Sequence, residues 1–563
     1  MYEDINLQHQ TNTYIEQKDQ IEVIDNTEEI EFKQLNYDQA LSQVGSSGYY
    51  QKRAFVIFGL QWMITTWILF GPVFYFIQPT INCKNDLNCY NECSTRILDE
   101  QCLSYICEDT SRIEFLVGNS LNTAFNTVLP CNKTLQSIIK SIVYFGSLTG
   151  FFIFSFIADN YGRKLALTLS WTITTIGSIT LASAQNFQMI TSAMFLLGFG
   201  GNPAITVHYS FINEHSQGHF RELQNVGLQV FFAIGEFTII TLAYYVTDWR
   251  SLAIIATIPI ILLNFANLFI LESPLFLYSK NKSQCVQTLN QIAKINSTKS
   301  IDIDELITNP KSKEKNQKMY TAWDLVRYKS IRYIFIACVM MFFGIQLIYY
   351  GISFVSDQLG MNFFTSNYII ALFELTAYLV TDFLVTKLKR KKNIILGFIL
   401  VGFMSQYFLI QFDNSLFIIM QGILAGLMRF IICVIWALAF VYVSELFPSV
   451  IRSLALLLIS AGGSIGSIVQ TFLNTLCQQY QVHPMVVFGI IGMLCGLLLL
   501  PLKETLNQGL IENIEEEEKI MNIKYQQSIE TEESGGVDQM NNVNEEREFL
   551  IIKTKNINTE KKD

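Results

Sequence analysis

The chain has 563 residues, of which 50% are hydrophobic and only 15% are charged, and its mean hydropathy is +0.31. This composition excludes a soluble multi-domain enzyme, because so apolar a chain cannot meet water on every side. The formal charge is −9, but the acidic residues are concentrated in segments 1–50 and 504–563, and the body between them has a small positive excess. The negative charge belongs to these two end segments, so it gives no evidence for a nucleic-acid partner.

Apolar stretches along the body have the length of membrane-spanning helices, which need about 20 residues at a rise of about 1.5 Å each. We expect twelve such spans, with two long connections, 78–136 and 272–331. The sequence predicts an all-α membrane protein with two pseudo-symmetric six-helix bundles, 51–271 and 332–503, and polar tails at 1–50 and 504–563 that we expect to be disordered. The predicted spans are 55–77, 137–158, 165–184, 189–212, 225–246, 251–271, 332–354, 366–386, 393–411, 416–443, 452–475 and 484–500.

The positions of Lys and Arg predict the orientation of these spans. Basic residues lie in the turns at 163–164 and 387–392 and throughout connector 272–331, whereas the turns near 185–188 and 355–365 contain none. Because positive residues accumulate on the cytoplasmic side, both termini and the connector are expected in the cytosol. The acidic, polar start of the chain shows no cleavable signal peptide. We expect a multi-pass protein of the plasma membrane.

The connection 78–136 is then exposed to an oxidising compartment, and it holds six of the eleven cysteines. An even number of cysteines there predicts a disulfide-stapled loop, with fifteen possible pairings. A metal site is less favoured, because the spacings lack paired C-x2-C units or histidine partners. Asn132 begins a glycosylation sequon, and Asn281 and Asn296 begin two more in the connector, on the side where this modification does not occur. The six cysteines are Cys83, Cys89, Cys93, Cys102, Cys107 and Cys131.

Charged residues reveal an internal repeat. Glu214 precedes Arg221 by seven positions, and Glu445 precedes Arg452 by the same number. Glu272 follows Glu214 and Glu504 follows Glu445 at nearly the same separation, so the offset between the halves is 231 or 232 throughout. The repeat predicts a duplicated six-span unit whose charges form ion pairs that gate the movement of the halves. The alternative is that these charges are solvated at the membrane interface.

Segment 159–164, Asp-Asn-Tyr-Gly-Arg-Lys, resembles the D-x-x-G-R-[RK] signature of the major facilitator superfamily. Within it, residues 48–515 resemble the organic cation, anion and carnitine transporter branch. The resemblance implies the major facilitator fold and gating roles for Asp159 and Arg163. The equivalent turn in the second half, 386–391, lacks the Asp and Gly, so gating contacts there are expected to be rearranged. The supporting motifs are 248–250 (Asp-Trp-Arg), 272–274 (Glu-Ser-Pro), 349–351 (Tyr-Tyr-Gly), 444–448 (Ser-Glu-Leu-Phe-Pro) and 503–505 (Lys-Glu-Thr).

Ionisable residues inside predicted spans are the best indicators of a substrate site, because lipid exposure of a charge is costly. Glu236, Glu374 and Arg429 stand out, and His208 is a weaker candidate. We expect Glu374 to face a central cavity, and the family resemblance places a Glu there. Arg429, which the helical period puts on one face with Trp436, is expected to line the cavity or to pair with Glu374 or Glu236 in a structural role.

The resemblance also implies substrate contacts from polar and aromatic residues, since aromatic ring faces hold organic cations. The alternative for each aromatic residue is ordinary packing. Ser464 occupies a position where cation transporters of the family have Asp and anion transporters have Arg, so it supports neither class. Two acids against one base then favour cationic or zwitterionic substrates. The implied contacts are Asn202, Tyr209, Gln229, Phe232, Phe342 and Tyr349.

These observations predict a transporter that moves small organic cations or zwitterions, such as carnitine-like compounds, by alternating access. Its partners are that small substrate and the lipid bilayer, and the oligomeric state is left open. No nucleophile–base set, phosphate-binding loop or metal cluster is recognisable, so we expect neither an enzyme nor a cofactor. Two alternatives remain: a transporter of sugars or other neutral solutes, and a receptor or scaffold that does not transport.

Overall fold

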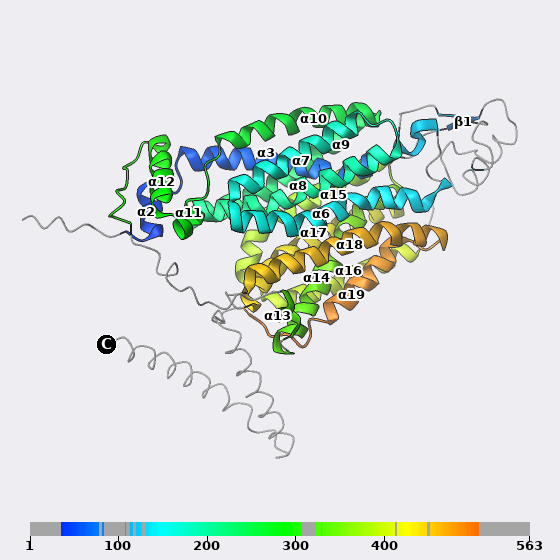
Figure 1. Cartoon of the computed structure of the whole chain (residues 1–563). Helices are drawn as coiled ribbons and strands as arrows, with labels where there is room; N and C mark the ends of the chain where they lie inside the picture. The colour runs from blue at the N-terminus through cyan, green and yellow to red at the C-terminus, as the bar shows by residue number, and fades with distance from the viewer. Residues whose placement is uncertain are drawn as a thin grey trace, which may run out of the picture. The chain divides into compact units, whose positions relative to one another are not determined.

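The computed structural model describes residues 35–77, 81–83, 107, 113–115, 120–126, 131–306, 322–327, 329–410, 414–447 and 451–505. These residues form two compact units. The connector unit contains the described residues of 1–55, 210–222 and 271–316, and the membrane unit contains the described residues of 56–209, 223–270 and 317–563. Figure 1 shows the helices and strands of the chain.

The first half of the chain contributes six long helices, one for each span predicted there (Figure 1). Gly162 separates α6 from α7 at φ +116°, a conformation that residues with a side chain rarely adopt, which explains the glycine in the signature turn. Asp248 caps α10 by accepting a hydrogen bond from Ser251 N at 2.7 Å. The helices are α3 (Tyr49–Tyr75), α6 (Lys133–Tyr161), α7 (Arg163–Ala182), α8 (Phe187–His215), α9 (Gly218–Tyr245) and α10 (Trp249–Ala266).

The second half repeats this arrangement. Across the described part of the chain, eleven helices are long and apolar enough to cross a membrane, and the twelfth predicted span is the shorter α19. Backbone hydrogen bonds between residues three or four apart continue past the end of α19 as far as Leu502. The helical turns of this apolar segment therefore extend beyond α19 itself. The helices are α14 (Lys329–Phe354), α15 (Phe363–Lys387), α16 (Arg390–Ser405), α17 (Ser415–Leu446), α18 (Arg452–Gln479) and α19 (Pro484–Leu497). The short helix α13 (Ala322–Arg327) precedes them.

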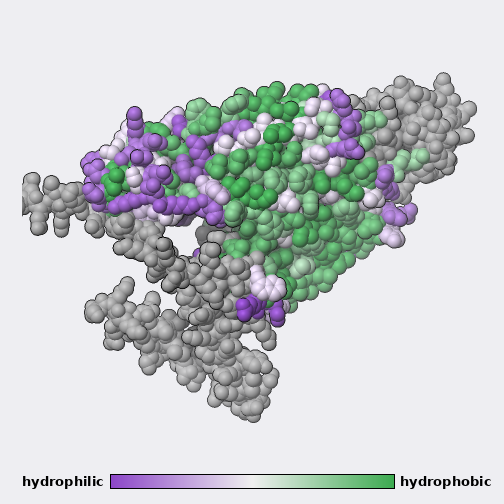
Figure 2. Space-filling view, viewed as in Figure 1, coloured by the Kyte–Doolittle hydropathy of each residue, from purple (hydrophilic) through white to green (hydrophobic). Residues whose placement is uncertain are grey.

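Small residues allow the helices of the membrane unit to approach closely. A side-chain carbon on Gly146 of α6 would lie 2.2 Å from the carbonyl oxygen of Phe195 on α8, so only glycine fits there. The outward-facing side chains are largely hydrophobic, and Figure 2 shows them as a broad apolar surface over the long helices. Such a surface suits contact with lipid.

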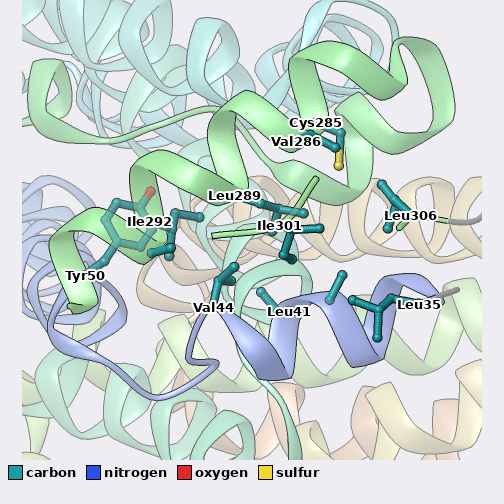
Figure 3. Packing of buried hydrophobic residues seen from close by; sticks show 12 residues of the cluster. Leu35, Leu41, Val44, Tyr50, Cys285, Val286, Leu289, Ile292, Ile301 and Leu306 are labelled. Carbon is teal, nitrogen blue, oxygen red and sulfur yellow. The ribbon is translucent and has the colours of Figure 1, made fainter. Parts of the chain in front are cut away.

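The connector unit has its own hydrophobic core (Figure 3). Helix α2 (Tyr37–Gln43) packs its apolar residues, including Leu41, against α12 (Lys282–Asn296), which contributes Leu289 and Ile292, and α11 (Pro274–Lys280) lies beside α12. Leu35 and Leu306 form a parallel β-bridge. Residues 35–50, assigned from sequence to a disordered tail, are thus folded here because their apolar side chains are buried.

Asn296 joins the N-terminal segment to α12. Its amide nitrogen donates to the carbonyl oxygens of Val44 and Gly45, both at 3.0 Å, and to Gln51 Oε1 at 3.1 Å. Its amide oxygen accepts from Tyr50 N at 2.9 Å. Four hydrogen bonds on one side chain fix the path of the chain just before α3.

In the long connection after α3, the described residues include two antiparallel strands, β1 (Ile81–Cys83) and β2 (Ile113–Phe115). Cys107 and Cys131 form a disulfide bond, which confirms a disulfide in this loop and gives one pairing that the sequence had left open. The bonding of Cys83, Cys89, Cys93 and Cys102 lies outside what the structure describes. Asn132 is exposed and caps α6 through Leu135 N, and its glycosylation stays a prediction.

Candidate functional site

Three ionisable side chains meet in the middle of the membrane unit. Arg429 comes from α17, Glu374 from α15 and Glu236 from α9. The exposed fractions of their side chains are 0%, 0% and 2%. A charge without a partner would be very unfavourable at such a position, so the contacts among the three determine whether the cluster is tolerated.

The Arg429 guanidinium contacts both carboxylates. Its Nε and Nη2 lie 2.6 and 2.5 Å from Glu374 Oε2, so one carboxylate oxygen accepts from two nitrogens. Nη2 also lies 3.4 Å from Glu236 Oε1. Nη1 donates to the backbone carbonyl of Tyr349 and lies 3.3 Å from Ser353 Oγ. Arg429 therefore joins an acid of the first half of the chain to an acid of the second.

Two tyrosines complete the hydrogen bonding of Glu374. The hydroxyl groups of Tyr349 and Tyr378 donate to its Oε1 at 2.8 and 3.0 Å. Tyr378 follows Glu374 by four residues on α15, and the helical period places both on one face. Both carboxylate oxygens of Glu374 are consequently occupied, whereas the two oxygens of Glu236 lie farther from Arg429 Nη2, at 3.4 and 3.5 Å.

Aromatic rings from both halves surround this cluster. The Arg429 Cζ atom lies 3.4 Å from the ring centroid of Tyr349 and 5.3 Å from that of Phe70 on α3. Trp436 meets the Tyr349 ring edge-on at 4.7 Å. Tyr350 lies 4.7 Å from Tyr144 of α6. These rings form an aromatic wall with a cation already against one of its faces.

The formal charges of this cluster do not balance. Glu236 and Glu374 carry two negative charges when both are ionised, and Arg429 carries one positive charge. An uncompensated charge inside an apolar bundle costs several kcal/mol, so the cluster favours one additional cation. We refer to Glu236, Glu374, Arg429 and the rings of Phe70 and Tyr349 as the charge cluster.

The other residues predicted to contact the substrate differ in their burial and in their neighbours. Phe232 is buried, and its ring lies 6.3 Å from that of Phe70, next to the charge cluster. Phe342 is buried against Phe440 at 5.0 Å. Tyr209 is 42% exposed. The remaining three differ in burial: Asn202 and Gln229 are half-buried, and Ser464 is buried on α18.

His208, the weaker candidate, is fully buried on α8 with its ring 4.6 Å from that of Phe58. Neither of its ring nitrogens has a hydrogen-bond partner among the described residues. Its ring packs against Phe58, an apolar side chain of the first half of the chain. This placement describes a packed imidazole rather than a member of the charge cluster.

The predicted gating charges contact partners near the helix ends. Arg163 lies 3.5 Å from the exposed Asp159 and donates to the Ala158 carbonyl at 2.7 Å. Glu504 accepts from the backbone N of Arg390 at 2.8 Å and so caps the start of α16, where the helix dipole favours an anion. Arg390 also lies 3.4 Å from Glu445 Oε1. At the turn 386–391, which lacks the Asp and Gly of the signature, Arg390 therefore makes the contacts to these two acids.

The internal repeat recurs in the contacts. Ser273 Oγ donates to the Glu214 carboxylate in the connector unit, and Thr505 Oγ1 donates to Glu445 Oε2 at 2.5 Å in the membrane unit. Each hydroxyl residue directly follows the second acid of its half, Glu272 or Glu504. Of the arginines at the seven-residue spacing, Arg221 is exposed and Arg452 donates to the Phe447 carbonyl, and their gating ion pairs stay a prediction.

Comparison with known proteins is consistent with this architecture. The profile of the family described as "Sugar (and other) transporter" matches residues 63–516. The chain belongs to this transporter family. It is 25% identical over 548 residues to the organic cation transporter protein of Drosophila melanogaster, covering 90% of this chain and 98% of that protein. It is 26% identical over 408 residues to the organic cation/carnitine transporter 2 of Rattus norvegicus, covering 71% and 72%.

Solved structures of transporters share the fold. The xylose transporter XylE from E. coli, in a partially occluded inward open conformation, matches with a TM-score of 0.56 and 16% identity over 83% of this chain and all of that one. This likeness confirms the predicted major facilitator fold and a multi-pass membrane protein. Membership of a transporter family also confirms the prediction of a transporter rather than an enzyme.

Several members of the site were missed by the sequence analysis. Phe70, Tyr144, Tyr350 and Ser353 reach the charge cluster or its wall through tertiary packing that leaves no local signal. Tyr378 did carry a signal, because it lies four residues after Glu374 on a predicted helix. A search for polar residues at helical spacing from each buried acid would have found it.

The two halves also meet at the helix ends nearest connection 78–136. The hydroxyl oxygens of Ser137 on α6 and Thr475 on α18 are 2.5 Å apart, and those of Thr241 and Tyr368 are 2.8 Å apart. The rings of Phe74 and Phe363 pack edge-on at 5.7 Å. These contacts join the two halves of the membrane unit at this end.

Proposed function

We propose that the protein transports small organic cations or zwitterions across a membrane by alternating access, with the charge cluster as the substrate site. The supporting observation is the fully buried pair of carboxylates that share one arginine. A cationic substrate would supply the missing positive charge, and the aromatic wall would contact its alkyl groups. The names of the organic cation and carnitine transporters to which the chain is similar favour the same substrate class.

In this proposal both termini and the connector unit face the cytosol, and connection 78–136 faces the exterior of the plasma membrane. The contacts Ser137–Thr475 and Thr241–Tyr368 then form the external closure. Opening to the exterior requires these contacts to break while contacts at the cytoplasmic ends form. Glu445, Arg390 and Glu504 are proposed to act at that cytoplasmic end.

Uptake by purified protein in proteoliposomes tests the proposal. We expect saturable uptake of labelled tetraethylammonium and L-carnitine, and little uptake of glucose. Glu374→Gln is expected to lower tetraethylammonium uptake at least about tenfold, since a charge-assisted hydrogen bond contributes about 1.5–3 kcal/mol. Glu222→Gln is the matched control, because Glu222 is an exposed acid that lies 3.7 Å from His219, which is also exposed.

Other outcomes would support the alternatives. Saturable glucose uptake without organic cation uptake would favour a transporter of neutral solutes, to which the chain's family description also extends. Binding of tetraethylammonium without flux would favour a receptor. Either result, with correctly folded protein, would contradict the proposed function.

A further inference from the structure

Helix α18 carries a polar face in the interior of the membrane unit. Ser467 Oγ donates to Gln346 Oε1 of α14 at 2.9 Å. Farther along α18, Asn474 Oδ1 accepts from the side-chain nitrogen of Gln358, which follows α14 in the chain, at 3.2 Å. Gln470 lies three residues after Ser467 and four before Asn474, so the helical period places it between these two contacts. We refer to Gln346, Ser467 and Gln470 as the amide face.

Two glycines show which helix this face of α18 meets. A side-chain carbon on Gly463 would lie 2.5 Å from Gln346 Nε2, and one on Gly466 would lie 2.2 Å from the carbonyl oxygen of Phe343 on α14. Gln470 follows Gly463 by seven residues, about two helical turns, and so lies on the same face. α18 also packs against α6, which belongs to the first half of the chain. Gln470 therefore faces α14 on a helix that borders the other half.

The amide group of Gln470 is buried and unpaired. Its side chain has no exposed surface, and neither its nitrogen nor its oxygen has a hydrogen-bond partner among the described residues. Such a group is unfavourable, because it has lost its hydrogen bonds to water and gained none from the protein. Gln470 differs from His208, whose ring packs against apolar Phe58, because its neighbours along the face of α18 are polar. Its partner is then water or a ligand.

The same stretch of α14 reaches both the amide face and the charge cluster. Gln346 precedes Tyr349 by three residues and Ser353 by seven, so the helical period places all three on one side of α14. Tyr349 and Ser353 both contact the Arg429 guanidinium. At a rise of about 1.5 Å per residue, Gln346 and Tyr349 are separated by about 5 Å along the helix. A small organic molecule is long enough to contact both places.

The amide of Gln470 favours one chemical class of partner. Its nitrogen donates and its oxygen accepts, so a group that both accepts and donates, such as a hydroxyl or an amide, satisfies both atoms. A carboxylate only accepts, and it would leave the amide oxygen unpaired. It would also bring a negative charge to a site where Glu236 and Glu374 already exceed Arg429 by one charge. An alkyl group satisfies neither atom.

We infer that Gln470 is a substrate-binding residue and that the preferred substrate is a monovalent organic cation carrying a hydroxyl or amide group. This inference rests on the proposed function and narrows its substrate class. The cationic group binds at the charge cluster and against its aromatic wall. The neutral group pairs with the amide of Gln470, beside the contact between Ser467 and Gln346. Cations with only apolar chains, and zwitterions with a carboxylate, are poorer substrates.

Matched pairs of compounds test this preference in proteoliposomes that contain the full-length protein. Each pair consists of a trimethylammonium ion with a hydroxyalkyl chain of two, three or four carbons and the analogue with a methyl group in place of the hydroxyl. Choline and propyltrimethylammonium are the shortest pair. For at least one chain length, we expect the hydroxyl compound to half-saturate uptake at a concentration at least about tenfold lower, because the analogue leaves a buried amide unpaired. The carboxylate analogue of that length is expected to bind more weakly than the hydroxyl compound.

Substitutions on α18 locate the preference. Gln470→Met keeps an unbranched side chain without the amide. It is expected to reduce the preference to about twofold or less, while the half-saturating concentration of the apolar analogue changes little. Gln470→Asn keeps the amide on a shorter side chain, and is expected to keep a preference for the hydroxyl at a longer chain length. Gln479→Met, at the exposed end of α18, is the matched control and should behave as the wild type.

The outcomes separate the inference from the proposed function. Equal half-saturation by both members of every pair in the wild type would overturn the inference, and would mean that water alone satisfies Gln470. An equal loss for both compounds in Gln470→Met would also overturn it, because that pattern indicates a packing role. Saturable uptake of the apolar cations in either case leaves the proposed function intact.

Absence of saturable uptake for all these cations and for tetraethylammonium would overturn the proposed function and the inference together. If Gln470→Met does not fold, Gln470→Asn decides. An unchanged preferred chain length in that variant would contradict the inference, because it would show that the amide does not contact the hydroxyl group.

Discussion

Removal of the central base is the most direct test of the charge cluster. Arg429→Met puts an unbranched apolar side chain in place of the guanidinium. It deletes the contacts to Glu374 at 2.5 and 2.6 Å and to Glu236 at 3.4 Å. Breaking one buried ion pair typically costs about 3–5 kcal/mol. Because this substitution leaves two acids without their base, we expect a loss of about 5 kcal/mol in the free energy of unfolding.

A second substitution should restore part of that loss. In the Arg429→Met background, Glu236→Gln removes one of the two unpaired acids, and a buried group left without its partner costs about 1–3 kcal/mol. We therefore expect the double variant to be more stable than Arg429→Met alone by about that amount. In the wild type the same substitution also removes the contact between Glu236 and Arg429 at 3.4 Å, so its gain in stability there is expected to be smaller.

Thermal unfolding of the purified proteins in one detergent measures the four members of this cycle. Glu222→Gln, introduced into both the wild type and Arg429→Met, provides the control, since an exposed acid should have the same small effect in each. Additive effects of Arg429→Met and Glu236→Gln would refute the reasoning, because they would mean that the two side chains do not interact in the folded protein.

Three further predictions address other contacts. Tyr378→Phe removes one hydroxyl donor from Glu374 and is expected to weaken tetraethylammonium binding by about tenfold or less, measured by competition. Cysteines at Ser137 and Thr475 are expected to form a disulfide on mild oxidation and to stop transport until reduced, because the two hydroxyl oxygens are 2.5 Å apart. Asn296→Ala deletes four hydrogen bonds in the connector unit and is expected to make segment 35–50 sensitive to limited proteolysis.

Each of these three predictions has a matched control variant. Tyr333→Phe removes a hydroxyl whose partner is a backbone carbonyl, Leu498 O, away from the charge cluster, and should leave binding unchanged. The single cysteine variants at 137 and 475 should remain active under oxidation. Gln284→Ala alters an exposed residue of α12 and should leave proteolysis unchanged. Equal effects of a test variant and its control would contradict the corresponding contact.

The apolar pattern predicted the helices well because membrane spans obey a strong local constraint. Each backbone polar group in the hydrocarbon layer must be satisfied within its own helix, so about 20 apolar residues suffice to define a span. The first half matched this expectation, and α19 departed from it because its regular helix is shorter than its apolar segment. Segment 35–50 was assigned to a tail because a short helix such as α2 is ordered by tertiary packing rather than by its own sequence.

The sequence by itself determined the membrane class, the family and the three ionisable residues of the site, since charges are so costly in an apolar span that each one stands out. Only the tertiary structure decided that Glu236 and Glu374 share Arg429, and that Phe70 and Tyr378 contact the same cluster. Contacts between distant helices depend on how the helices pack, and that packing leaves no periodic signal along the chain.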